Sequence, residues 1–211
     1  MHSQFNFVYN PDYTIPVEID NNTTNIYVLK RPHVDHFLKE MAKYYEVIIY
    51  TASLSKYADP LMDQMDLQGY CTARLFREHC AFVNGVFVKD MSVLGRDQKD
   101  TILIDNSPTS YMLQPECGLP ILSWYDDKND SVLLDYIPLL VEMAKLHDVR
   151  EAIPKFVKNH SFDMQKAMSI CSHLLRRHYN QAIEKHENQT KPMINTWIKN
   201  KPEDITAIYE D

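Results

Sequence analysis

The chain has 211 residues, of which 45% are hydrophobic, enough for one α/β domain with a modest extension. Its formal charge of −7 at pH 7 argues against a protein that binds nucleic acid through its overall charge, because such proteins carry a basic surplus. Any phosphate site must therefore be a local group of basic side chains.

The first third of the chain alternates β-prone or apolar runs with polar turns. Asn21-Asn22-Thr23 separates two β-prone runs, as in a hairpin, and Pro32 stands where it can open a helix. A continuous apolar run then ends at Thr51. The predicted elements are a hairpin of strands 12–20 and 24–30, a helix over about 32–45, a buried strand over 47–50 and a helix over about 54–65.

The middle of the chain continues this alternation. Asn84-Gly85 marks a second turn, and another buried run leads to Asp105. The predicted elements are strands at 73–77, 81–88, 101–104 and 120–122 and an amphipathic helix over 131–145. Apolar runs that alternate with helices predict a parallel sheet covered on both faces. Ligands of such open sheets bind at the carboxyl ends of the strands.

The sequence suggests two regions, a domain over 1–150 and a helical C-terminal extension over 151–211. Apolar residues at helical spacing predict one helix over 162–185, with a stripe interpreted as core or docking surface rather than as a cofactor site. The members of the stripe are Met164, Met168, Cys171, Leu175 and Ala182.

Export and membrane signals are missing from the sequence. We find no signal peptide and no apolar run of membrane-spanning length. The four cysteines are widely spaced and form no Cys-x-x-Cys pair, so neither a zinc site nor a redox motif is indicated. They are interpreted as buried free thiols in a reducing compartment.

Three polar clusters stand at predicted strand ends. Thr51, with the N–H groups of the next helix, suits a phosphoryl oxygen, although Thr and Ser also cap helices. Lys89 could neutralise phosphoryl charge, although a solvated lysine is the simpler interpretation. Asp105 and Asn106 at the end of a buried strand could hold Mg²⁺, with a helix cap as the alternative.

Together and in this order the clusters become more specific, and longer strings extend them. These strings are Leu29-Lys30-Arg31-Pro32, Tyr50-Thr51-Ala52-Ser53-Leu54, Lys56-Tyr57-Ala58-Asp59-Pro60, Arg74-Leu75-Phe76-Arg77-Glu78, Val88-Lys89-Asp90, Leu94-Gly95-Arg96 and Ile104-Asp105-Asn106-Ser107-Pro108. Over about residues 2–150 the sequence resembles the small phosphatases of the RNA polymerase II C-terminal domain, also called NLI-interacting-factor-like phosphatases. The resemblance implies the haloacid dehalogenase (Rossmann-like) parallel sheet, with a β-hairpin insertion.

The resemblance also implies an activity. Such enzymes are phosphoserine/threonine protein phosphatases that transfer phosphate to an aspartate and then to water, with Mg²⁺ bridging. Thr51 matches their phosphate-binding hydroxyl, and Lys89 matches their charge-neutralising lysine. Asp105 matches the Mg²⁺ carboxylate, and Asn106 matches the neighbour that orients the metal and its water shell.

Substrate contacts follow from the same resemblance. Tyr57 and Arg77 match substrate-contacting positions, and the guanidinium fork suits phosphate or carboxylate. An apolar pocket that receives a proline near the phosphoserine is matched by Phe5, Val17, Ile19, Ile26 and Leu54, for which ordinary core is the alternative. The implied partner is a phosphoserine-proline segment, such as the RNA polymerase II C-terminal tail, with no nucleic acid or membrane. The implied location is nuclear or cytoplasmic.

One motif of the family does not occur in this sequence. It is Asp-x-Asp-x-Thr on the first, central strand, whose first Asp is the nucleophile and whose second is the general acid/base. His2-Ser3-x-Phe5 matches what immediately follows that motif, so the sheet is expected to lack its first, central strand. Loss of a covalent nucleophile typically costs about 10⁴ to 10⁶ in rate. We therefore expect no meaningful phosphatase activity and weak or absent Mg²⁺ binding.

Three explanations of the missing motif are open. A central strand buries about four apolar side chains, and its loss would forfeit about 6–12 kcal/mol, the stability of a whole domain. This favours an N-terminally truncated record or a fragment of a longer phosphatase, as does the retention of Thr51, Lys89 and Asp105. The alternatives are a pseudophosphatase or scaffold that binds phosphopeptides and, less favoured, a binding module like the mitochondrial import receptor.

Overall fold

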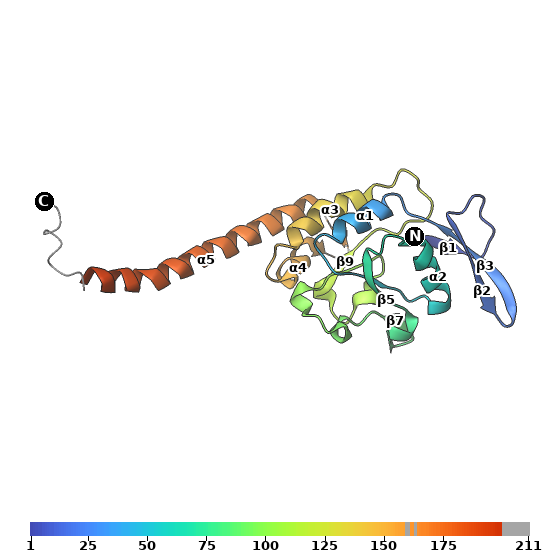
Figure 1. Ribbon diagram of the computed structural model, residues 1–211, viewed down its shortest axis with the longest axis horizontal. Coiled ribbons are helices and arrows are strands. Elements are labelled where there is room, and N and C mark those ends of the chain that lie inside the picture. The colour runs from blue at the N-terminus through green and yellow to red at the C-terminus, as the bar shows by residue number, and fades with distance from the viewer. Residues whose placement is uncertain (159–160, 163, 200–211) are drawn as a thin grey trace, which may run out of the picture. The chain divides into compact units, whose positions relative to one another are not determined.

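Residues 1–158, 161–162 and 164–199 are described in the computed structural model, whose ribbon is drawn in Figure 1. The chain divides into two units, Met1–Cys171 and Ser172–Asp211. The strands and helices are β1 (His2–Gln4), β2 (Tyr13–Ile19), β3 (Asn22–Leu29), α1 (Val34–Met41), β4 (Val47–Tyr50), α2 (Ser55–Met65), β5 (Cys71–Leu75), β6 (Ala81–Val83), β7 (Val86–Val88), β8 (Leu103–Asp105), β9 (Gly118–Pro120), α3 (Val132–Met143), α4 (Ile153–Phe156), β10 (Val157–Lys158), β11 (Ser161–Phe162) and α5 (Met164–Lys199). The fold is α/β, as the sequence predicts.

The predicted N-terminal hairpin is present as β2 and β3. Its turn consists of Asp20 and Asn21 rather than the predicted Asn21-Asn22-Thr23, because Asn22 and Thr23 already pair within β3. Asp20 and Asn21 have φ angles of 51° and 59°. Type I′ hairpin turns require this left-handed conformation, which Asp and Asn tolerate. β1 adds a third antiparallel strand beside β3. One face of the hairpin joins a core cluster with α2, whose members are Ile15, Val17, Ile26, Val28 and Leu61.

Parallel pairing is present at both places where the sequence predicts buried strands. β4 pairs with β5, and β8 pairs with β9. Within the described residues these pairs are two separate two-stranded sheets. Neighbouring strands in a sheet lie about 4.8 Å apart and share a hydrogen-bond ladder; no such ladder joins β4 to β8 in the described part of the chain. That a central strand belongs between them stays a prediction.

Helices α1 and α2 pack on the β4–β5 pair. Leu38 of α1 and two methionines of α2, Met62 and Met65, form one buried cluster, against which Val47 and Ile49 of β4 pack. The helix predicted over 32–45 is confirmed in type but ends earlier, because backbone turns follow Met41. Its early end directs the chain into β4.

Beyond residue 150 the chain forms α4, the strand pair β10–β11 and α5. Ala167 and Cys171 are fully buried in the first unit. The buried face of α5 therefore differs from the predicted stripe. Ala167 is buried but was not predicted, whereas two predicted members are not buried: Met168 is half-buried and Ala182 is exposed. A small alanine allows close packing that hydrophobicity alone does not reveal. No helix in the described ranges has an apolar stretch long enough to cross a bilayer.

A buried ion pair fastens the end of β3 to the loop before α3. The Arg31 guanidinium donates from Nε and Nη2 to the two carboxylate oxygens of Asp130, at 2.7 and 2.8 Å, and from Nη1 to the carbonyl of Leu122 at 2.9 Å. The two side chains are 8% and 12% exposed. This contact joins two segments of the first unit that lie about a hundred residues apart in the sequence.

We expect Asp130→Asn to lower the free energy of unfolding by about 3–5 kcal/mol, because it leaves a buried guanidinium without its counter-charge. Urea denaturation followed by circular dichroism measures this change. Glu46→Gln is the matched control: it neutralises a carboxylate that also binds an arginine, Arg96, through both oxygens, but at the surface. It should cost under about 1 kcal/mol. Equal losses in the two variants would contradict this account.

The same pair predicts an acid dependence of stability. Hydrogen bonding from Arg31 lowers the pKa of Asp130 below its ordinary value. The contribution is therefore present above the ordinary pKa of an aspartate, about 3.9, and is lost as the pH falls through the lowered one. Unfolding titrated from pH 6 down to about pH 2 should show a shallower loss of stability for Asp130→Asn than for the unaltered chain, and parallel curves would contradict the assignment.

Candidate functional site

Thr51 directly follows β4 and begins the loop that leads to α2. Its N–H donates to the carbonyl of Leu75 at 2.9 Å, so the backbone continues the pairing with β5 by one residue. Its hydroxyl accepts a hydrogen bond from the N–H of Ser53 at 3.1 Å. The hydroxyl is thus fixed at the carboxyl end of the strand, where the sequence predicts a ligand site.

Lys89 and Asp105 form a buried ion pair. Lys89 follows β7, and its N–H donates to the carbonyl of Ser110 at 2.9 Å. Its ammonium group donates to one carboxylate oxygen of Asp105, the last residue of β8. The other oxygen accepts from the N–H of Ser107 at 2.8 Å. The side chains are only 12% and 7% exposed, so the pair compensates two charges that would be costly to bury singly.

Asn106 lies beside this pair but points to a different partner. The residue is exposed, and its amide donates to the hydroxyl of Ser123 at 2.8 Å. Both oxygens of Asp105 already accept hydrogen bonds, and the described residues contain no group of three His, Cys, Asp or Glu side chains that could hold a metal ion. Mg²⁺ prefers octahedral oxygen coordination. The described residues by themselves do not fit a Mg²⁺ site.

Arg77 joins the site from the loop after β5. Its N–H donates to the carbonyl of Ser53 at 2.9 Å, and its Nε donates to the carbonyl of Ala52 at 2.6 Å. The guanidinium lies over the ring of Phe87, 5.1 Å from its centroid. Arg77 is therefore fastened to the segment that directly follows Thr51.

The Cys80 thiol lies beside the backbone of Thr51. Its sulfur is 3.8 Å from the carbonyl oxygen of Thr51. Burial raises the pKa of the thiol, and the nearby Lys89 and Arg77 charges oppose that shift. All four cysteines are free, as predicted, but Cys71 and Cys80 are only half-buried, against the prediction of buried thiols. The raised pKa of Cys80 makes it a poor nucleophile.

The residues of the predicted proline pocket divide into two groups. Val17 and Ile26 are buried in the hairpin core, and Tyr57 packs against that core. The other three, Phe5, Ile19 and Leu54, are 60%, 36% and 42% exposed. The alternative interpretation as core therefore describes the placement of the first two, and the pocket itself stays a prediction.

The strongest sequence signal that was missed lies in the β6–β7 hairpin. A two-residue turn at Asn84-Gly85 pairs residue 82 with residue 87, and both are phenylalanine. Their rings contact at a centroid distance of 5.0 Å. The turn was predicted, so counting outward from it would have found this aromatic pair beside Lys89.

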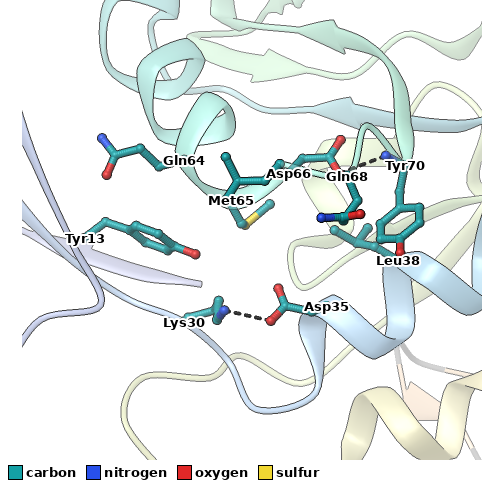
Figure 2. A pocket seen from close by; sticks show the side chains of 10 residues that line it. Tyr13, Lys30, Asp35, Leu38, Gln64, Met65, Asp66, Gln68 and Tyr70 are labelled. Atoms are coloured by element: carbon teal, nitrogen blue, oxygen red, sulfur yellow. Dashed lines mark hydrogen bonds and ion pairs between the residues drawn. The ribbon is translucent and has the colours of Figure 1, made fainter.

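A cavity of about 290 Å³ opens elsewhere, between the hairpin, α1 and α2 (Figure 2). Its charged groups are already bonded: Lys30 pairs with Asp35 at 2.8 Å, and Asp66 accepts from the N–H groups of Tyr70 and Cys71 at 2.9 and 2.8 Å. Tyr70 leads into the amino end of β5, whereas the candidate site lies at the carboxyl ends of the strands. The cavity contains none of the predicted site residues. Its lining is Tyr13, Lys30, Asp35, Leu38, Gln64, Met65, Asp66, Leu67, Gln68 and Tyr70.

The sequence has close relatives among characterised proteins. It is 51% identical over 150 residues to a probable C-terminal domain small phosphatase of Dictyostelium discoideum, covering 71% of this chain and 49% of that protein. It is 48% identical over 149 residues to the human carboxy-terminal domain RNA polymerase II polypeptide A small phosphatase 2, covering 71% of this chain and 55% of that protein. The chain thus spans about half the length of these relatives.

Similarity to solved structures is weaker. A fission yeast RNA polymerase II CTD phosphatase bound to beryllium fluoride aligns with a TM-score of 0.46 and 14% sequence identity, over 85% of this chain and 55% of that one. This likeness is too low to support an argument. The family model for NLI interacting factor-like phosphatases, however, matches residues 1–150. The chain therefore belongs to the family of NLI interacting factor-like phosphatases.

Proposed function

We propose that this chain provides the phosphate-binding residues of a phosphoserine/threonine protein phosphatase. The observation that carries the proposal is the buried Lys89–Asp105 pair at the end of β8. Thr51 directly after β4, and Arg77, which is bonded to the carbonyl of Ala52, are the further residues of the proposed site. A lysine held in a largely buried position can neutralise a phosphoryl oxygen more strongly than one in water. The hydroxyl of Thr51 adds a hydrogen-bond donor at the same edge.

Phosphate entry requires the ion pair to open. Lys89 must move its ammonium group from Asp105 to the phosphoryl oxygen, and a cation or proton must then compensate the carboxylate. In this proposal the site residues of this chain bind phosphate, and none of them attacks the phosphorus atom.

We infer that the chain alone does not turn over substrate, because its sequence holds no Asp-x-Asp-x-Thr motif. Among the residues that the structure describes, β4 and β8 each pair with a neighbour on one side only, and both lead to site residues, Thr51 and Asp105. A strand between them would pair with both open edges and bring its own last residues to the same site. This arrangement supports the interpretation that a central strand carrying the nucleophile completes the sheet.

The proposed substrate is a phosphoserine-proline segment of a protein, by analogy with relatives whose names specify the RNA polymerase II C-terminal domain. A nuclear location accompanies that substrate. The net charge of −7 fits a local cationic site better than a broad nucleic-acid surface.

A second candidate function is phosphopeptide binding without hydrolysis, as in a pseudophosphatase or scaffold. It is favoured by a cationic site whose residues are in place while a nucleophile is missing from the sequence. No feature of the described residues specifically favours an import-receptor-like module.

Phosphate release from a phosphoserine-proline peptide separates these functions. With Mg²⁺, the chain alone should release no phosphate above background, yet it should bind this peptide at least about tenfold more tightly than its unphosphorylated form, because of charge-assisted contacts. A chain preceded by a short apolar strand that ends in Asp-x-Asp-x-Thr should release phosphate. The same extension with its first Asp changed to Asn is the matched control. Turnover by the unextended chain, or binding that ignores phosphorylation, would sink the proposal.

We also expect Asp105→Asn to strengthen the binding of inorganic phosphate on the order of tenfold in the absence of metal, since the carboxylate competes with phosphate for Lys89. Lys89→Met should abolish that binding. Isothermal titration calorimetry measures both affinities, with folding checked by circular dichroism.

Asp90→Asn is the matched control for this titration, because Asp90 is adjacent in sequence but accepts from Ser92 at 2.9 Å and from Gln114 at 2.9 Å instead. It removes the same charge without freeing Lys89. An equal gain in phosphate affinity from Asp90→Asn would show that the ion pair is not the competitor.

A further inference from the structure

The β6–β7 hairpin exposes an aromatic pair next to the candidate phosphate site. Phe82 and Phe87 are register partners, with ring centroids 5.0 Å apart and an interplanar angle of 49°. They are 65% and 38% exposed. Val88 on the opposite face of the hairpin is fully buried, so it anchors the hairpin to the domain. The aromatic pair is thus the outward face of a fastened element.

This pair lies next to Lys89 in the sequence and against Arg77 in space. Phe87 and Lys89 are two residues apart, the spacing that places side chains on one face of an extended segment, about 7 Å from each other. Arg77 lies over the Phe87 ring on one side and is bonded to the carbonyl of Ala52 on the other. A ligand that reaches Lys89 along this face would pass over the rings.

We propose that Phe82 and Phe87, with Arg77 at their edge, form a subsite for an apolar side chain of the phosphoprotein substrate, two or three residues from its phosphoserine. The proposal rests on the proposed function and adds a specificity element to it. An extended peptide advances about 3.3 Å per residue, so two or three residues span the distance from Lys89 to the rings. An apolar side chain there would cover ring surface that is otherwise in water.

Stabilisation of the hairpin is the simpler explanation of an aromatic pair, because facing rings in neighbouring strands contribute to sheet stability. That role requires ring contact but not the location beside Lys89 and Arg77. The contact between the two rings also leaves Phe82 65% exposed, so hairpin stability does not use most of its surface. The two roles differ in a measurable way, since hairpin stability does not depend on the sequence of a peptide ligand.

The test compares the binding of paired phosphoserine peptides to the full chain by fluorescence polarisation. One peptide of each pair carries phenylalanine at position −3, −2, +2 or +3 from the phosphoserine, and the other carries serine there. We expect the unaltered chain to prefer phenylalanine about tenfold at one of these positions. In Phe82→Ser the preference should fall below about threefold while binding still requires the phosphate, and Phe82→Tyr should keep the preference.

Tyr44→Ser is the matched control, since Tyr44 is also an exposed aromatic residue, 49% exposed, but precedes β4 at the end remote from Thr51. It should leave both the preference and the phosphate dependence unchanged. A phosphate-dependent chain without any preference, or a preference that survives Phe82→Ser, would overturn the subsite and leave the proposed function standing. Binding of phosphorylated and unphosphorylated peptides with equal affinity would overturn the proposed function and the subsite with it.

Discussion

The ion pair between Lys89 and Asp105 is the contact on which the candidate site depends. It joins the residue after β7 to the last residue of β8, in surroundings where either charge alone would be costly. The second oxygen of Asp105 is bound by the N–H of Ser107, so the carboxylate is fully engaged. In this state the Lys89 cation and the Asp105 anion compensate each other, and in the proposed function phosphate competes with Asp105 for Lys89.

The parallel strands that lead to the site residues have unpaired edges in the described part of the chain. β4 and β8 deliver Thr51 and Asp105, yet each strand has a partner on one side only in the described part of the chain. Two-stranded parallel sheets are weak by themselves and gain stability from neighbours. The first unit compensates with packed helices and the buried Arg31–Asp130 contact, which holds together segments distant in sequence.

Much of this fold could be predicted from the sequence because local signals were strong. The turn residues of both hairpins specify left-handed backbone conformations, and the apolar run of β4 is continuous. Lys89 and Asp105 were also predicted as site residues from the sequence, but with separate roles. Their pairing depends on how β7 and β8 meet in space, which no local pattern contains. The buried face of α5 was misplaced for a similar reason, since the close packing of Ala167 depends on its surroundings.

In the proposed function Lys89 exchanges Asp105 for a phosphoryl oxygen. Crystal structures of the chain with and without tungstate, a phosphate analogue, test it most directly. The account predicts that the Lys89 ammonium group contacts Asp105 in the free chain and leaves it for a tungstate oxygen, with the Thr51 hydroxyl as a second contact. Tungstate bound elsewhere, with the Lys89–Asp105 pair intact, would contradict the account.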